Sequence, residues 1–283
     1  MRYLIIVVIA AGISGGPLVA QEEMLIELEQ SSQDHMREEL GVNEVTAPQV
    51  QKLMVDLEAF RPLSMEIVEA NNRDASFSNR FQTALHFGSL VADGFVIVIA
   101  ERQQDIQDIG RALIRQSRSL GVGDSLLNRS KSLIELGDKG DWMKLREELV
   151  QTQVEIENAM MQLRDEEMAH MISFGGWLRG FQLAVNSTAE NYTPVRAEAL
   201  NRVDVMDYFI DRLETLNPRL KRTELVTQLL AKMKTVRAIV AQRGGSAPTS
   251  SEVAEMRQLA NEMIEASMSQ VDAEGRIIQK SLE

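Results

Sequence analysis

A seven-residue repeat of large side chains in the middle of the chain constrains the fold more than any other feature. Its members are Trp142, Leu149, Ile156, Leu163, His170 and Trp177. This spacing returns to one face of an α-helix every two turns and is typical of a helix packed against a partner, as in a coiled coil. It predicts one helix from 141 to at least 172, about 48 Å long at 1.5 Å per residue, with Gly175 and Gly176 as a kink or break.

A second long stretch, 78–120, has the same character. From Phe81 onward its apolar residues recur at steps of three, four or seven and keep one helical face. Its middle, 95–100, is apolar all round and β-branched, so a buried strand is the alternative there. We favour one straight or kinked helix, because both flanks carry the helical period and no other strand-like run could pair with this one.

The rest of the chain is also rich in helix formers and contains only six prolines. Thr249 and Glu252 stand at capping-box spacing, and Thr193 precedes Pro194 at another helix start. Further helices are expected at 22–40, 47–60, 124–136, 204–216, 218–243 and 250–280. The fold class is therefore all-α, a bundle of long antiparallel amphipathic helices with several short connecting helices.

Small residues indicate where two of these helices approach closely. Ala84, Gly88 and Ala92 are four apart, and so are Gly176 and Gly180. Residues four apart share a helical face, and the lack of a large side chain there lets two backbones come together.

The first twenty residues have the layout of a signal peptide. A basic start is followed by an apolar run and a small-residue exit, which predicts cleavage after Ala20. An uncleaved anchor is the alternative, but glycines and Pro17 interrupt the run before it is long enough to span a bilayer. We therefore expect an exported protein, periplasmic or secreted, with a helical segment at 21–72 and the main bundle at 73–283.

The composition excludes several classes of partner. The chain has no cysteine, and loss of Arg2 with the signal changes its formal net charge from −12 to −13. This acidic balance argues against binding nucleic acid or an anionic membrane surface. No membrane span is expected after cleavage, and the helical stripes are compatible with a monomer or a small homo-oligomer.

Two residues have the spacing of metal ligands. Glu167 and His170 form the Glu-x-x-His pattern of di-iron bundles, but such sites need a second copy of it, which neither His35 nor His86 supplies. A mononuclear divalent-metal site that adds His86 and Asp93 requires the two long helices to pack side by side. The simpler interpretation is that His170 belongs to the helix seam, so no cofactor is predicted.

The segment around Gly175 and Gly176 combines four residues suited to ligand binding: Phe174, Trp177, Arg179 and Phe181. Aromatic side chains at a kink can line a ligand or peptide groove, with the arginine meeting an anionic group. The alternative is that these residues are core packing at a close helix crossing.

The helix at 218–243 carries seven basic residues against a single glutamate, Glu224. A basic strip of this kind can bind an acidic partner. It can also dock against acidic faces of neighbouring helices, which is the interpretation that we favour.

Three functional hypotheses follow. The favoured one is an exported, non-enzymatic helical bundle that binds a protein, peptide or small ligand. The second is a metal-binding bundle centred on Glu167 and His170. The third is a hydrolase or lyase with an unrecognised site; it is the weakest because the chain that follows the predicted cleavage site lacks cysteine, a Gly-x-Ser-x-Gly turn and a phosphate-binding glycine loop.

Overall fold

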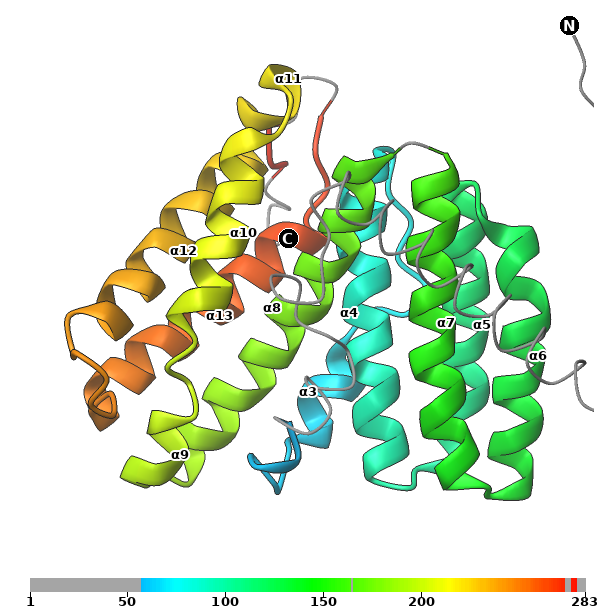
Figure 1. Ribbon diagram of the computed structural model, residues 1–283, viewed down its shortest axis with the longest axis horizontal. Coiled ribbons are helices and arrows are strands. Elements are labelled where there is room, and N and C mark those ends of the chain that lie inside the picture. The colour runs from blue at the N-terminus through cyan, green and yellow to red at the C-terminus, as the bar shows by residue number, and fades with distance from the viewer. Residues whose placement is uncertain (1–56, 164, 273–275, 279–283) are drawn as a thin grey trace, which may run out of the picture. The chain divides into compact units, whose positions relative to one another are not determined.

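The computed structural model describes residues 57–163, 165–272 and 276–278 (Figure 1). These residues lie within one compact unit, Glu44–Glu283. Three predictions fall outside the described residues. They are the signal peptide at 1–20, the helix at 22–40, which includes His35, and nearly all of the helix at 47–60.

Helices account for almost all regular structure in the described ranges. They are α3 (Met65–Ala70), α4 (Arg80–Ile99), α5 (Gln103–Leu120), α6 (Gly123–Lys139), α7 (Trp142–Gln162), α8 (Glu166–Glu190), α9 (Pro194–Glu198), α10 (Val203–Thr215), α11 (Pro218–Lys221), α12 (Glu224–Ala241) and α13 (Ser250–Met268). Within these ranges the only β pairing is an isolated bridge between Val271 and Ile277. The all-α prediction is confirmed, and the apolar run after Phe95 is helical.

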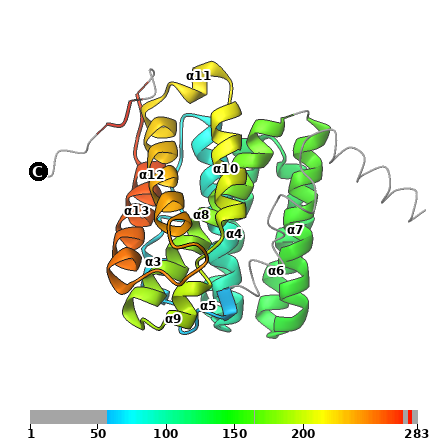
Figure 2. The same cartoon turned by 60° about the vertical axis from the view of Figure 1, so that its left-hand side comes forward.

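The long helices alternate in direction along the chain, up and down (Figures 1 and 2). Helices α4 to α7 form one group, and α8, α10, α12 and α13 form another. The most extensive helix contact joins α4 to α8, at the centre of the fold. These two helices run in the same direction, because three helices of alternating direction lie between them in the sequence.

Two of the predicted long helices are each divided in the structure. The predicted helix 78–120 ends at Ile99, Glu101 takes a positive φ of 53°, and α5 starts at Gln103. The predicted helix from 141 ends at Gln162, and α8 begins after a short break. Each break reverses the chain, so that both halves pack in the bundle. A helical repeat does not show such a reversal when no Gly or Pro marks it.

Other expectations about helix ends were also wrong. Gly175 and Gly176 lie inside the continuous helix α8 and do not break it. Leu163, a predicted seam residue, lies at the break before α8 and is 53% exposed. The predicted helix 218–243 is interrupted before α12, where the Thr223 side chain caps the new helix by accepting a hydrogen bond from the Val226 amide.

The glycines of α4 and α8 allow the close central contact. A Cβ added to Gly88 would lie 1.9 Å from the carbonyl oxygen of Ile172, and one added to Gly175 would lie 2.0 Å from that of Leu85. Gly176 faces Gly88, where an added Cβ would be 3.3 Å from the backbone oxygen. Backbone atoms cannot move aside as a flexible side chain can. The predicted close approach at Gly88 and Gly176 is therefore confirmed.

Helix α4 is buried on all its faces, since the bundle surrounds it. By length and composition it is also the one helix in the described ranges that could cross a membrane, and the apolar window that gives this result is entirely buried inside the protein. Burial on every side explains why the sequence of α4 shows no polar face.

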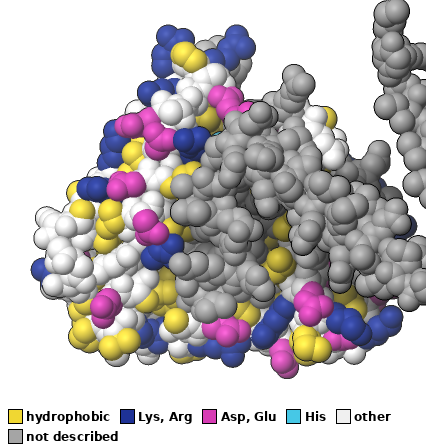
Figure 3. All heavy atoms as spheres, in the orientation of Figure 1, with side chains coloured by type: hydrophobic (Ala, Val, Ile, Leu, Met, Phe, Trp, Pro, Cys, Tyr) yellow, Lys and Arg dark blue, Asp and Glu magenta, His cyan; other side chains and the backbone are white. Residues whose placement is uncertain are grey.

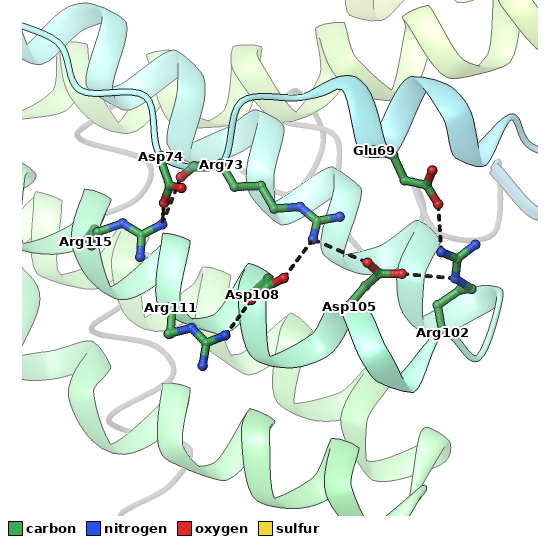
Figure 4. Close-up of polar contacts among 8 residues, drawn as sticks. All are labelled: Glu69, Arg73, Asp74, Arg102, Asp105, Asp108, Arg111 and Arg115. Atoms are coloured by element: carbon green, nitrogen blue, oxygen red, sulfur yellow. Dashed lines mark hydrogen bonds and ion pairs between the residues drawn. The ribbon is translucent and has the colours of Figure 1, made fainter.

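Ion pairs fasten α3 and the connection that follows it onto α5 (Figure 4). Arg102 contacts Glu69 at 2.7 Å and Asp105 at 3.0 Å, and Arg115 pairs with Asp74. Most of these groups are partly exposed, so each pair contributes little to stability. Together they hold the α3–α4 connection against α5, and at the start of this connection the half-buried Asn71 donates a hydrogen bond to Asp93 of α4.

The predicted capping box at the start of α13 is present. The Thr249 side chain accepts a hydrogen bond from the Glu252 amide, and the Glu252 carboxylate accepts one from the Thr249 amide at 2.7 Å. Thr249→Ala removes this cap, and we expect a loss of about 1 kcal/mol in the free energy of unfolding. Urea denaturation measures it, with the exposed first-turn Ser250→Ala as control. An equal loss in both variants would show that the cap contributes nothing.

Candidate ligand-binding site

The aromatic residues of α8 form a stack along one face of that helix. The rings of Trp177 and Phe181 are nearly parallel, at an interplanar angle of 11° and a centroid distance of 5.2 Å. Phe174 continues the row at 6.3 Å from Trp177, and Phe209 of α10 packs against both. Steps of three and four residues place the side chains on one helical face, where α10 covers them.

A small apolar cavity opens beside this stack, with a volume of about 50 Å³. Trp177, Phe181 and Ala184 of α8 form one wall, and the rest of the lining comes mainly from the turn at 57–60 and the α9–α10 connection. The other apolar side chains of the lining are Leu57, Phe60, Ala199, Leu200 and Val205. Arg202 lies among the lining residues and binds Asp204 at 3.2 Å. The cavity therefore suits an apolar group.

The structure places the four residues of the predicted ligand site in two environments. Trp177 and Phe181 line the cavity, whereas Phe174 is fully buried and Arg179 forms part of a polar cluster with α4. The anionic group that Arg179 contacts is Asp93 of the same chain. Its guanidinium Nε lies 2.7 Å from Asp93 Oδ1, and Nη2 lies 3.2 Å from Oδ2.

This buried ion pair is hydrogen-bonded on all sides. The Arg179 side chain is 3% exposed, and that of Asp93 is 0% exposed. Arg179 also donates to the carbonyl oxygen of Ile67 at 2.7 Å and to Gln182 Oε1 at 2.6 Å, while the Asn71 amide donates to Asp93 at 2.5 Å. Burial raises the pKa of Asp93, and the Arg179 guanidinium and the Asn71 amide oppose that rise.

The two predicted metal ligands, Glu167 and His170, have separate partners. The Glu167 carboxylate accepts hydrogen bonds from the backbone and side-chain nitrogens of Asn217, at 2.7 and 2.6 Å, and so holds the start of α11. His170 Nδ1 lies 3.0 Å from the Tyr208 hydroxyl of α10. Nowhere in the described ranges do three His, Asp or Glu side chains converge as metal ligands, so His86 and Asp93 do not complete this site.

The basic residues of α12 pair with acidic residues of neighbouring helices. Arg237 contacts Asp207 of α10 at 2.8 Å, Lys234 contacts Glu214, and Lys232 contacts Glu262 of α13. In Figure 3 positive and negative side chains alternate over this part of the surface. These pairs favour the interpretation that the basic residues dock against neighbouring helices. They speak against a free basic strip that binds an acidic partner.

Most of the cavity lining and the pairing of Asp93 with Arg179 were not predicted from the sequence. The lining of Leu57, Leu200 and Val205 comes from segments far apart in the sequence, and no local pattern links them. Asp93 did carry a signal: it is a lone charge in an apolar helix, as is Arg179 in the middle of α8. Charges in such positions require partners, so the two could have been paired with each other.

The fold and the site define an all-α, up-and-down bundle with an apolar cavity beside an aromatic stack. Comparison with protein-family models, with curated proteins and with solved structures gives no match for this chain.

Proposed function

We propose that the chain is an exported, non-catalytic helical bundle that binds a peptide or protein segment by taking one apolar side chain into the cavity beside Trp177 and Phe181. The observation that carries this proposal is the apolar lining of the cavity. Arg202 is the one ionisable side chain among the lining residues that the structure describes. General acid–base or nucleophilic chemistry needs at least two cooperating polar groups, so the lining favours binding over catalysis. The proposal that the protein is exported rests on the sequence of residues 1–20.

The size of the cavity narrows the ligand class. Pockets for cofactors and drug-sized molecules are typically about 300 Å³ or larger, whereas this one is about 50 Å³. A water molecule in the liquid takes about 30 Å³. The cavity therefore fits only the end of a short aliphatic group, such as the tip of a leucine or methionine side chain, and the remainder of such a ligand would lie on the surface.

Tryptophan fluorescence tests this proposal. Trp142→Phe leaves Trp177 as the single tryptophan, and N-acetyl-leucine amide is the probe. We expect a saturable change in emission, because the probe's side chain would contact the indole ring. In the same background Ala184→Leu fills the cavity and should abolish the change. The control is Ala189→Leu, on the same helix outside the cavity lining, which should keep it.

Two results would overturn the proposal: an emission that does not saturate with the probe, or an equal response in the Ala184→Leu and Ala189→Leu variants. The first result would mean that the cavity takes no aliphatic group. The second would mean that the probe acts elsewhere on the protein.

A divalent-metal function at Glu167 and His170 is the second candidate, and its support is weaker. Both side chains already hold hydrogen-bond partners on α10 and α11, as described above. Adding zinc or iron to the purified protein and recording the melting temperature tests it. A rise that His170→Gln removes would favour this candidate over the peptide-binding one.

A further inference from the structure

We propose that His86 acts as an acid-sensitive lock between α4 and α8. In this proposal the protonated imidazole cannot be accommodated at the centre of the bundle, so acid loosens the contact between the two helix groups.

The surroundings of His86 hold it in the neutral form. The residue is 1% exposed, and among the described residues neither of its ring nitrogens has a hydrogen-bond partner. Its ring packs edge-on against Phe77, with centroids 5.4 Å apart. A protonated imidazole would bury two N–H donors and a positive charge without a partner, which is far more costly than burying the neutral ring.

The charges near His86 oppose its protonation. Arg179 of α8 acts on it directly, and Asp93, two turns further along α4, is already bound to that arginine. Burial is the larger cause and Arg179 the smaller one, and together they lower the pKa of His86 to about 4.

In the part of the chain that the structure describes, no other element packed on α4 offers a carboxylate to either ring nitrogen. In the α3–α4 connection Arg73 pairs with Asp105 of α5, and Asp74 pairs with Arg115. Helix α13 reaches α4 through the carbonyl oxygens of Ser267 and Ser269, which accept hydrogen bonds from Gln82. Helix α7 meets α4 through the Leu149 side chain, at Gly94.

The direction in which stability changes with pH follows from the lowered pKa of His86. An unfolded histidine titrates near 6.5, so between pH 6.5 and 4 the unfolded state binds more protons than the folded state. The stabilisation due to neutral His86 is therefore present above pH 6.5 and is lost as the pH falls toward 4. Because a charged His86 would repel Arg179, which ties α8 to Asp93 of α4, the loss acts on the contact between these two helices.

Hydrogen exchange of the full chain tests the lock. We expect protection of 80–99 and 166–190 to fall together between pH 7 and pH 4.5 in the wild type, after correction for the intrinsic exchange rate. His86→Gln should move the midpoint of that loss toward acid, because glutamine takes up no proton in this pH range. The control, His170→Gln, removes the buried histidine of α8 that contacts Tyr208 of α10. Burial, and to a smaller extent Arg212, also lowers the pKa of His170 to about 4, so this variant separates the two histidines and should leave the loss of protection at 80–99 in place.

An NMR titration of the wild-type imidazoles decides the question even if His86→Gln fails to fold. A signal of His86 that stays neutral until the protein loosens supports the lock. A signal that titrates near pH 6.5 in the folded protein overturns it, and so does an unchanged midpoint in a folded His86→Gln variant.

Discussion

Gly88→Ala is expected to destabilise the protein by about 3 kcal/mol or more, one of the largest effects of a single methyl group in this fold. The added Cβ would lie 1.9 Å from the carbonyl oxygen of Ile172, which is far inside van der Waals contact. The obstacle is backbone, so α4 and α8 would have to separate along their central contact. Urea denaturation followed by circular dichroism measures the loss.

Gly94→Ala is the matched control, because it makes the same change in the same helix. There the nearest atoms to the new Cβ are in the side chains of Leu149, at 3.5 Å, and Ile109, at 3.7 Å, and both distances are ordinary contacts. Alanine is a better helix former than glycine by about 0.5–1 kcal/mol, so this variant should be neutral or slightly more stable. Similar losses in the two variants would mean that the close approach of α4 and α8 does not depend on Gly88.

Arg179→Met is expected to cost about 3–5 kcal/mol, because it leaves the Asp93 carboxylate buried without its cation. The Asp93 side chain is 0% exposed and cannot turn to solvent. The double variant Asp93→Leu, Arg179→Met replaces the whole pair with apolar groups. It should be more stable than the Arg179→Met variant alone, because no uncompensated charge remains.

A double-mutant cycle at pH 7, with the free energy of unfolding as the measured quantity, checks this expectation. Arg237→Met provides the comparison with a surface pair, since Arg237 and Asp207 are 40% and 50% exposed. The loss in the free energy of unfolding of the Arg237→Met variant should stay below about 1 kcal/mol. Additive losses from the two buried substitutions would show that Asp93 and Arg179 are not coupled.

Local features of the fold were readable from the sequence. The capping box of Thr249 and Glu252 and the start at Thr193 and Pro194 are present as predicted. These features involve residues within one helical turn, where side chain and backbone satisfy each other without help from the rest of the chain. Helical periodicity likewise predicted the fold class and the helical state of the apolar run after Phe95.

The chain reversals between α4 and α5 and between α7 and α8 could not be predicted from the sequence. The helical period continues through Glu101 and Leu163, so 78–120 and 141–172 each resembled one long helix. The structure divides both, because each half buries its apolar face only if the chain folds back into the bundle. The balance between continuing a helix and packing its halves depends on partners far away in the sequence.

The candidate site likewise has a part that the sequence predicts and a part that it does not. The sequence by itself determined that Phe174, Trp177 and Phe181 share one face of a helix, because residue spacing and helical geometry fix that relation. Only the tertiary structure decided that Trp177 and Phe181 line a cavity while Arg179 is committed to Asp93. The physical reason is that a cavity wall and a buried charge pair are built between helices, and their positions follow from how the helices pack.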